Sequence, residues 1–500
     1  MKDILEIESF GTIDADSDDL LYDCFEDHEA YTNILQMKRF LISGRKGAGK
    51  TAIFKKLITT KEPTTFSFGH TFSDYPWHLH DKQGRVGVPD QDKYTHSWKY
   101  LIAMTISKLI LNNDKSLPYN METLDDVARI EKFVVDSYGS KNPDVTQIFS
   151  PSKTLKIKPT LEINLLELLK FGVSPEAVPI EYLPTIIQDV NSNLISSTIS
   201  ILNPEHKYFI CFDQLDLGFD PTNPDYARRL IGLILAAKEI NQYAKDNGKQ
   251  LFITIFLRDD IYNKLQFEDK NKITENLLSI IEWDTPRTTY TLKRLMEKRL
   301  RATFGEGQHS ISWNQVFDEA TEMPGRQSKY QHMIDRTMLR PRDIIRFSNT
   351  ILSESKKRIN GTEEKTKSFI NSDIHKAREH YSAYFLREID DEIHKHLPNY
   401  KKYLDIFKSI GVYRFDLQQF LEEFEKQKIN TPEIVQPIQI LKYLYDFSLV
   451  GFYRPGGRGF GGADYISKHK FPDEEFDVTS SKFQIHPALI EVLGLKKFEK

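Results

Sequence analysis

The residues best suited to chemistry stand in one short glycine-rich stretch. Residues 44–51 read GRKGAGKT and match the pattern G-x-x-x-x-G-K-[ST] in full. Glycines let such a loop turn its backbone N–H groups toward phosphate oxygens, and the helix that follows offers its positive end. We expect Lys50 to reach the β- and γ-phosphates of a nucleotide and Thr51 to ligate Mg²⁺. The expected nucleotide contacts are Gly44, Arg45, Lys46, Gly47, Ala48, Gly49, Lys50, Thr51 and Ala52.

An acidic strand end is the second candidate. Four apolar residues precede Asp213, and the carboxyl end of a buried parallel strand is where open α/β sheets bind ligands. Asp213 is therefore expected to hold Mg²⁺, directly or through water. Asp216 either orients or deprotonates an attacking water, or caps a helix. Many ATPases carry a second acid where this chain has Gln214, so hydrolysis is either slow or dependent on Asp216.

Arg258 completes the expected catalytic set of Lys50, Asp213, Asp216 and Arg258. It closes the apolar run LFITIFL at residues 251–257. If that strand lies beside the strand ending at Asp213, Arg258 points to the γ-phosphate and senses the nucleotide state. The alternative is an ion pair with Asp259 or Asp260.

The elements that must position these residues follow a strand–helix–strand pattern. Residues 208–217 begin with an apolar run and end in acidic residues, and residues 251–257 are apolar throughout. Both patterns are typical of parallel strands covered on both faces, and residues 228–243 between them repeat apolar residues at helical spacing. The chemistry-bearing loop has its own strand before it and helix after it. We predict an α/β P-loop core with a parallel sheet.

Four regions are expected along the chain. About 160 residues separate Thr51 from Asp213, which predicts a large insertion at about 60–200. Strands stop near Tyr290, and the composition changes again near residue 396. The predicted regions are an acidic helical lead-in at 1–36, the P-loop core at 37–290, a helical lid at 291–395 and a winged-helix-like domain at 396–500.

The expected insertion is dense in aromatic residues and histidines. His78 and His80 lie close in sequence, with Asp74 and Asp81 nearby, but their spacing matches no zinc set. An interaction surface for a partner or a second copy is the favoured reading of this region, and a metal site is the alternative.

Composition excludes several classes of protein. The 500 residues include 68 basic and 72 acidic ones, a net charge of −4, so any nucleic-acid site must be a local patch. No apolar run approaches the roughly 20 residues of a membrane helix. The two cysteines, Cys24 and Cys211, form no disulfide framework or zinc spacing. No signal peptide is evident, and we expect a cytoplasmic protein without a membrane role.

Three stretches resemble P-loop ATPases of the AAA+/STAND group, and in particular a bacterial family within it. They are GRKGAGKTAIFKKL, FICFDQLD and FITIFLRDDIYNKLQFEDKNKITE. The resemblance implies ATP and Mg²⁺ as cofactors and an arginine supplied in trans by a homo-oligomer, for which the candidates are Arg228, Arg229 and Arg287. It also implies a switch or motor that acts with a separate effector protein, as relatives do in antiphage defence.

Residues 339–345, LRPRDII, resemble the start of the last lid helix in archaeal ATPases and origin-recognition proteins. In that relationship Arg342 matches the second sensor arginine, which contacts the nucleotide from the lid. Arg342 could equally pair with a neighbouring acid.

The C-terminal region looks like a winged helix, with helices expected at 403–410, 417–426 and 432–449. The glycine-rich segment from Gly451 is the expected wing, flanked by strands at 465–466 and 483–485. Basic residues gather here and could track a phosphate backbone, namely Arg454, Arg458, Lys468, His469 and Lys470. The third expected helix offers little basic support for base reading, so a protein interface is the other reading.

Three functions remain open from the sequence. The first is an ATP-hydrolysing molecular switch. The second is an initiator-like protein whose DNA binding is controlled by ATP. The third is a scaffold that needs nucleotide only for stability.

Overall fold

The computed structural model describes residues 2–72, 75, 77, 94–149, 155, 183–217, 223–305, 311–361, 368–394, 396–427, 436–456 and 464–496. These residues form two compact units. The sheet unit comprises Asp27–Arg45 and Lys50–Ile281. The lid unit comprises Met1–Glu26, Lys46–Gly49 and Glu282–Lys500.

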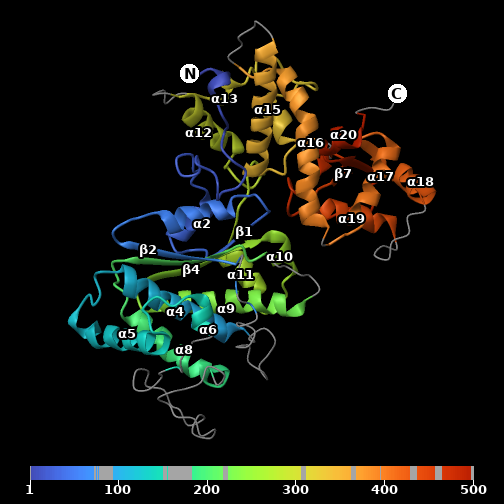
Figure 1. Ribbon diagram of the computed structural model, residues 1–500. Coiled ribbons are helices and arrows are strands. Elements are labelled where there is room, and N and C mark those ends of the chain that lie inside the picture. The colour runs from blue at the N-terminus through green and yellow to red at the C-terminus, as the bar shows by residue number, and fades with distance from the viewer. Residues whose placement is uncertain are drawn as a thin grey trace. The chain divides into compact units, whose positions relative to one another are not determined.

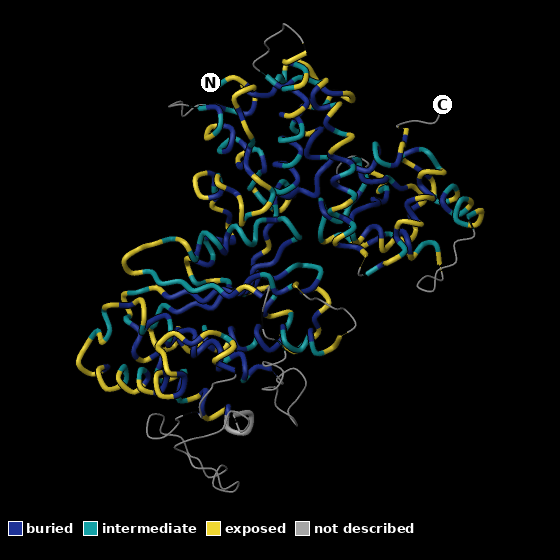
Figure 2. Tube along the Cα trace, in the orientation of Figure 1, coloured by how far each residue is buried: buried dark blue, intermediate teal, exposed yellow. Residues whose placement is uncertain are grey.

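The sheet unit is built on five parallel strands in the order β2-β3-β4-β1-β5. The buried runs of β1, β3 and β4 are rich in Ile, Leu and Phe, residues that suit a pleated surface covered on both faces. Figure 2 shows the middle strands of this sheet as buried. The strands are β1 (Leu41–Gly44), β2 (Thr65–Thr71), β3 (Lys207–Asp213), β4 (Gln250–Arg258) and β5 (Leu278–Ile280).

Helices cover both faces of this sheet. α2 lies on one face, and α4 and α9 cover the other, with α5 and α8 packed outside α4 (Figure 1). Asn223 caps α9 through the N–H of Asp225, and Pro224 occupies its first turn. The described helices are α1 (Glu29–Leu35), α2 (Lys50–Thr59), α4 (Thr95–Asn113), η2 (Met121–Thr123), α5 (Leu124–Tyr138), α6 (Val145–Phe149), α8 (Leu183–Ser200), α9 (Pro224–Asp246), α10 (Asp259–Lys264) and α11 (Lys270–Leu277).

The range 60–200, expected as an insertion, contains core elements. β2 is an edge strand of the central sheet, and α4 packs against it with a largely buried surface. The sequence of β2 hides this role because TFSFGHT mixes polar and aromatic residues instead of forming a continuous apolar run. His78, His80, Asp74 and Asp81 lie outside the described residues.

The lid unit contains two long helices that pack side by side, α15 (Pro341–Gly361) and α16 (Asn371–Ile393). Both carry an apolar face and a charged face, the pattern of a helix pair with one solvated side. The other elements here are η1 (Ile4–Glu6), α12 (Leu292–Phe304), α13 (Trp313–Val316) and α14 (Lys329–Ile334).

The C-terminal part of the lid unit has the helices and antiparallel sheet of a winged helix. Its four strands lie in the order β6-β9-β7-β8, and its last helix and η4 (Pro487–Leu489) pack against α16. The elements are α17 (Tyr400–Ile410), β6 (Arg414–Asp416), α18 (Leu417–Gln427), α19 (Pro437–Asp446), β7 (Val450–Arg454), β8 (Asp464–Ile466), β9 (Lys482–Ile485) and α20 (Ile490–Leu493). The expected fold class, a P-loop α/β core followed by a helical lid and a winged helix, is confirmed.

Two local expectations differ from the structure. Within the lead-in expected to be helical at 1–36, residues 14–28 form turns and irregular backbone, and α1 starts only at Glu29. Asp14 and Asp18 accept hydrogen bonds from nearby backbone N–H groups, which favours turns over a helix here. The third helix of the winged helix begins at Pro437, where the missing proline N–H costs least, and residues 428–435 lie outside the described residues. Within the described part of the chain, no helix is both long and apolar enough to cross a membrane.

Candidate nucleotide-binding site

The expected strand, loop and helix are present at residues 41–59. β1 ends at Gly44 and α2 begins at Lys50. Gly47 and Gly49 take φ angles of +79° and +111°, a region that side chains with a Cβ rarely adopt. At Gly49 nothing lies within 4 Å of an added Cβ, so the backbone angle alone requires glycine there. We call residues 44–51 the phosphate loop.

Lys50 is anchored to the loop that it closes. Its ammonium donates to the carbonyl oxygens of Gly44 at 2.7 Å and Arg45 at 2.9 Å. Burial lowers the pKa of Lys50, and the nearby carboxylates of Asp216, Asp259 and Asp213 oppose that shift. The Lys50 ammonium therefore lies near three carboxylates, those of Asp213, Asp216 and Asp259.

Asp213 occupies the predicted position at the end of β3. It is 3% exposed, and it accepts hydrogen bonds from the N–H of Gln214 and the side chain of Thr51. Burial raises the pKa of Asp213 to about 6. Its Oδ2 atom is buried and has no hydrogen-bond partner among the described residues. A buried carboxylate oxygen without a partner, beside a threonine hydroxyl, fits the oxygen ligands that Mg²⁺ prefers.

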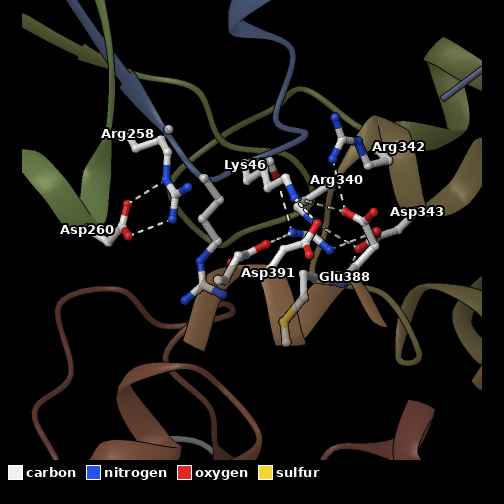
Figure 3. Close-up of polar contacts among 12 residues, drawn as sticks. Lys46, Arg258, Asp260, Arg340, Arg342, Asp343, Glu388 and Asp391 are labelled. Carbon is white, nitrogen blue, oxygen red and sulfur yellow. Dashed lines mark hydrogen bonds and ion pairs between the residues drawn. The ribbon is translucent and has the colours of Figure 1, made fainter. Parts of the chain in front are cut away.

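Arg258 lies where the strand pairing predicts. It stands opposite Gly44 in the register of β1 and β4, so it lies at the carboxyl edge of the sheet. It donates to both carboxylate oxygens of Asp260, at 2.9 and 2.7 Å (Figure 3). It also donates to Asp216 at 3.4 Å. The structure therefore shows the expected ion pair with Asp260, and the same guanidinium also donates to Asp216.

Sequence reasoning considered Asp259 only as an alternative ion-pair partner of Arg258, which it follows at the start of α10. Burial raises the pKa of its carboxyl group, and the charges of Arg45 and Lys50 oppose the shift. Asp259 directly follows a buried strand, and this position indicates a candidate ligand-binding residue in the same way as the position of Asp213 at the end of β3. Gln214 has a φ of +60°, so the residue in place of the usual second acid adopts a left-handed conformation.

Within the lid unit, the tip of the phosphate loop contacts several charged residues. Lys46 pairs with Asp391 on α16 at 2.7 Å. Arg342 pairs with Glu388 at 2.9 Å, and its side chain lies only about 3 Å from where a Cβ on Gly47 would be. Figure 3 shows these pairs around the start of α15. Of the two readings of Arg342, the structure shows the pairing with a nearby acid and also places the residue against the loop.

Two further lid-unit residues contact the loop, and sequence reasoning missed both. Arg340 donates to the backbone oxygen of Lys46, and Trp283 donates to that of Ala48. The sequence carried no signal for Trp283, which follows a short strand in an irregular segment.

The three arginines named as trans candidates all have partners within their own units. Arg228 pairs with Asp225 at 2.9 Å, and Arg229 lies over the ring of Trp77 with 5.1 Å to its centroid. Arg287 pairs with Glu282 and with Asp473. These contacts do not rank them.

The described basic residues of the wing are also paired. Arg454 contacts Glu474 at 2.6 Å, Lys468 contacts Glu475 at 3.4 Å, and Lys470 contacts Asp335 at 2.7 Å. His469 is buried, and Arg458 lies outside the described residues. No group of three or more His, Cys, Asp or Glu residues within the described ranges could hold a metal ion.

Comparisons with known proteins give limited matches. A family described as the FunZ-associated C-terminal helical domain matches residues 290–390, the span of α12 to α16. No curated protein matches the sequence.

Two solved structures are similar over most of the chain. The Aeropyrum pernix Orc1 protein, in complex with DNA, is 13% identical with a TM-score of 0.36, over 92% of this chain and 94% of its own. Cdc6p from Pyrobaculum aerophilum is 11% identical with a TM-score of 0.29, over 94% and 93%. A likeness at these scores carries no argument about the activity or partners of this chain.

Proposed function

We propose that this chain is an ATP-dependent molecular switch that binds ATP with Mg²⁺ and hydrolyses it. The unpartnered Oδ2 of Asp213, buried beside Thr51 at the end of a complete phosphate loop, carries this proposal. A structural carboxylate would be expected to have its oxygens satisfied, because an unmet buried acceptor costs about 1–3 kcal/mol.

Each residue of the site has a role in this proposal. The loop N–H groups and Lys50 bind the phosphates, and Thr51 and Asp213 hold Mg²⁺. When bound, the ion neutralises charge that develops on the phosphates. Asp216 orients the attacking water or accepts its proton. Arg258 binds the γ-phosphate in exchange for its present carboxylate partners.

Arg342 is proposed as a lid contact to the nucleotide. Its Nε is buried without a hydrogen-bond partner among the described residues, and Nε lies 3.2 Å from where a Cβ on Gly47 would be. An unsatisfied cationic donor beside the loop tip suits an anionic ligand.

Binding is tested by titrating the protein with ATP and Mg²⁺ in a calorimeter. Lys50→Ala is expected to weaken binding by about a hundredfold, because it removes a charge-assisted hydrogen bond to phosphate worth about 3 kcal/mol. Lys55→Ala, a lysine of the same helix α2, is the matched control and should bind like wild type. Full affinity in Lys50→Ala would overturn the assignment of the loop.

Hydrolysis is tested separately, since Gln214 replaces the usual second acid. Asp216→Asn is expected to lower the turnover rate by about a hundredfold while ATP affinity stays within about twofold, as general acid–base catalysis predicts. Equal and negligible turnover in wild type and variant would favour the alternative, a scaffold that only binds nucleotide.

The resemblance further implies assembly of several copies or with an effector, and a role in defence against phages. We propose that ATP controls this assembly. Sizing the protein with ADP, ATP and a non-hydrolysable analogue tests it, and an unchanged size in all three would contradict it.

A further inference from the structure

Two backbone carbonyls of the phosphate loop are held by side chains from far along the chain. Arg340 Nη1 donates to the oxygen of Lys46 at 3.0 Å, and Trp283 Nε1 donates to the oxygen of Ala48 at 3.0 Å. Both donors belong to the same compact unit as the loop tip. A loop that turns its N–H groups toward an anion turns its carbonyl groups the other way, and these need donors of their own.

Arg340 is fixed by more than this one bond. Its side chain is 1% exposed, and it donates to both oxygens of Asp343 at 2.9 Å and to Glu392 at 2.6 Å. A planar guanidinium held along one edge by a carboxylate has little freedom to rotate. The hydrogen bond to Lys46 is therefore directed by a buried network from α15 and α16 (Figure 3).

Trp283 is similarly fixed by burial. It is 4% exposed, and its indole N–H can only donate. Ala48 is itself 3% exposed, so its carbonyl oxygen cannot rely on water in place of that donor.

We propose that Arg340 and Trp283 are positioning residues that hold the carbonyls of Lys46 and Ala48 and thereby keep the loop N–H groups aimed at a phosphate. This inference rests on the proposed nucleotide binding. A loop held in its binding conformation loses less freedom when the ligand arrives, which strengthens affinity. The lid residue that controls the loop main chain is thus Arg340, two positions before the arginine that the family resemblance selects.

The first test needs no nucleotide. Backbone hydrogen exchange over residues 44–51 is measured in wild type, Arg340→Met and Arg299→Met. Arg299 is the matched control, because it is 5% exposed in the same unit and donates to a carbonyl, Phe10 O at 2.9 Å, and to Asp18 at 2.5 Å. We expect exchange in the loop to be at least tenfold faster in Arg340→Met than in wild type or Arg299→Met.

The second test measures ATP affinity at an equal distance below each variant's melting temperature. Arg340→Met should raise the dissociation constant by about tenfold, as removal of a supporting outer contact typically does. Arg340→Lys, which keeps one donor near Lys46, should restore part of it. Arg299→Met should lose stability without losing affinity.

Trp283→Phe covers the case in which Arg340→Met does not fold. It removes the indole N–H together with the five-membered ring and keeps a six-membered aromatic ring, and we expect a three- to tenfold loss of affinity with faster loop exchange. If loop exchange in both Trp283→Phe and any folded Arg340 variant equals wild type, the positioning role is wrong, whatever the nucleotide result. If exchange accelerates but wild type itself binds no nucleotide, the proposed function fails instead.

Discussion

The phosphate loop and the wing are both glycine-rich and basic, yet Lys50 of the loop and Arg454 of the wing have different partners. Lys50 is directed to carbonyls of its own loop, and nearby Asp213 keeps one buried oxygen without a hydrogen-bond partner among the described residues. Arg454 on the wing pairs with Glu474, and both side chains are more than two-fifths exposed. Composition alone therefore does not distinguish a loop with buried, unsatisfied polar groups beside it from a solvated surface with paired charges.

The largest effect should come from the carboxylate. Asp213→Asn keeps the shape of the side chain but removes the charge that would hold Mg²⁺, and a loss of about 4 kcal/mol would lower turnover roughly a thousandfold. ATP turnover as a function of Mg²⁺ concentration measures it. Asp225→Asn, at the exposed start of α9, is the control. If ATP turnover depends on Mg²⁺ in the same way in Asp213→Asn and wild type, Asp213 does not hold the ion, and the loop would no longer differ from the wing in this respect.

The next effect, at most about 1.4 kcal/mol per pH unit, concerns the buried edge beside Asp213. His70 on β2 stacks on Phe212 and hydrogen-bonds Thr105 at 2.9 Å, and burial lowers its pKa to about 3. The unfolded chain takes up this proton near pH 6.5 and the folded chain does not, so stability is lost as pH falls from about 6.5 toward 3.

Unfolding by urea at several pH values checks this. Relative to His70→Asn, wild type should lose at most about 1.4 kcal/mol of its free energy of unfolding per pH unit in that range. Parallel slopes for the two proteins would mean that His70 takes up its proton in the folded state too.

The smallest effect is expected at the wing. Arg454→Ala should change stability by less than about 1 kcal/mol, because exposed ion pairs contribute little. If the wing binds nucleic acid, the same change should lower the salt dependence of binding by about one unit of slope. Titration of a DNA duplex at several salt concentrations measures this. Strong binding that depends on Arg454 would show that the ion pair with Glu474 opens for phosphate, and the comparison with the loop would then fail.

Much of the site was predictable because its signals are local. The pattern at residues 44–51 defines a strand, a loop and a helix in one continuous stretch. Asp213 and Arg258 each follow an apolar run, and the ends of parallel strands meet at one edge of a sheet. Asp259 also follows an apolar strand, so the same reasoning could have added it to the candidate site.

Other features had no local signal. β2 escaped recognition because an edge strand need not be a continuous apolar run. Residues 14–28 of the lead-in expected to be helical at 1–36 are not helical, since short acidic side chains form hydrogen bonds with the backbone in turns as readily as they begin helices.

The sequence by itself determined that a glycine-rich loop between a strand and a helix is followed by an acidic strand end and a basic strand end, because each of these residues is adjacent in the chain to its strand. Only the tertiary structure decided which cations have carboxylate partners and which donors hold the loop. Lys46 and Arg340 are 294 positions apart, and Ala48 and Trp283 are 235 apart. Contacts of that separation depend on how helices and strands pack, which no local pattern encodes.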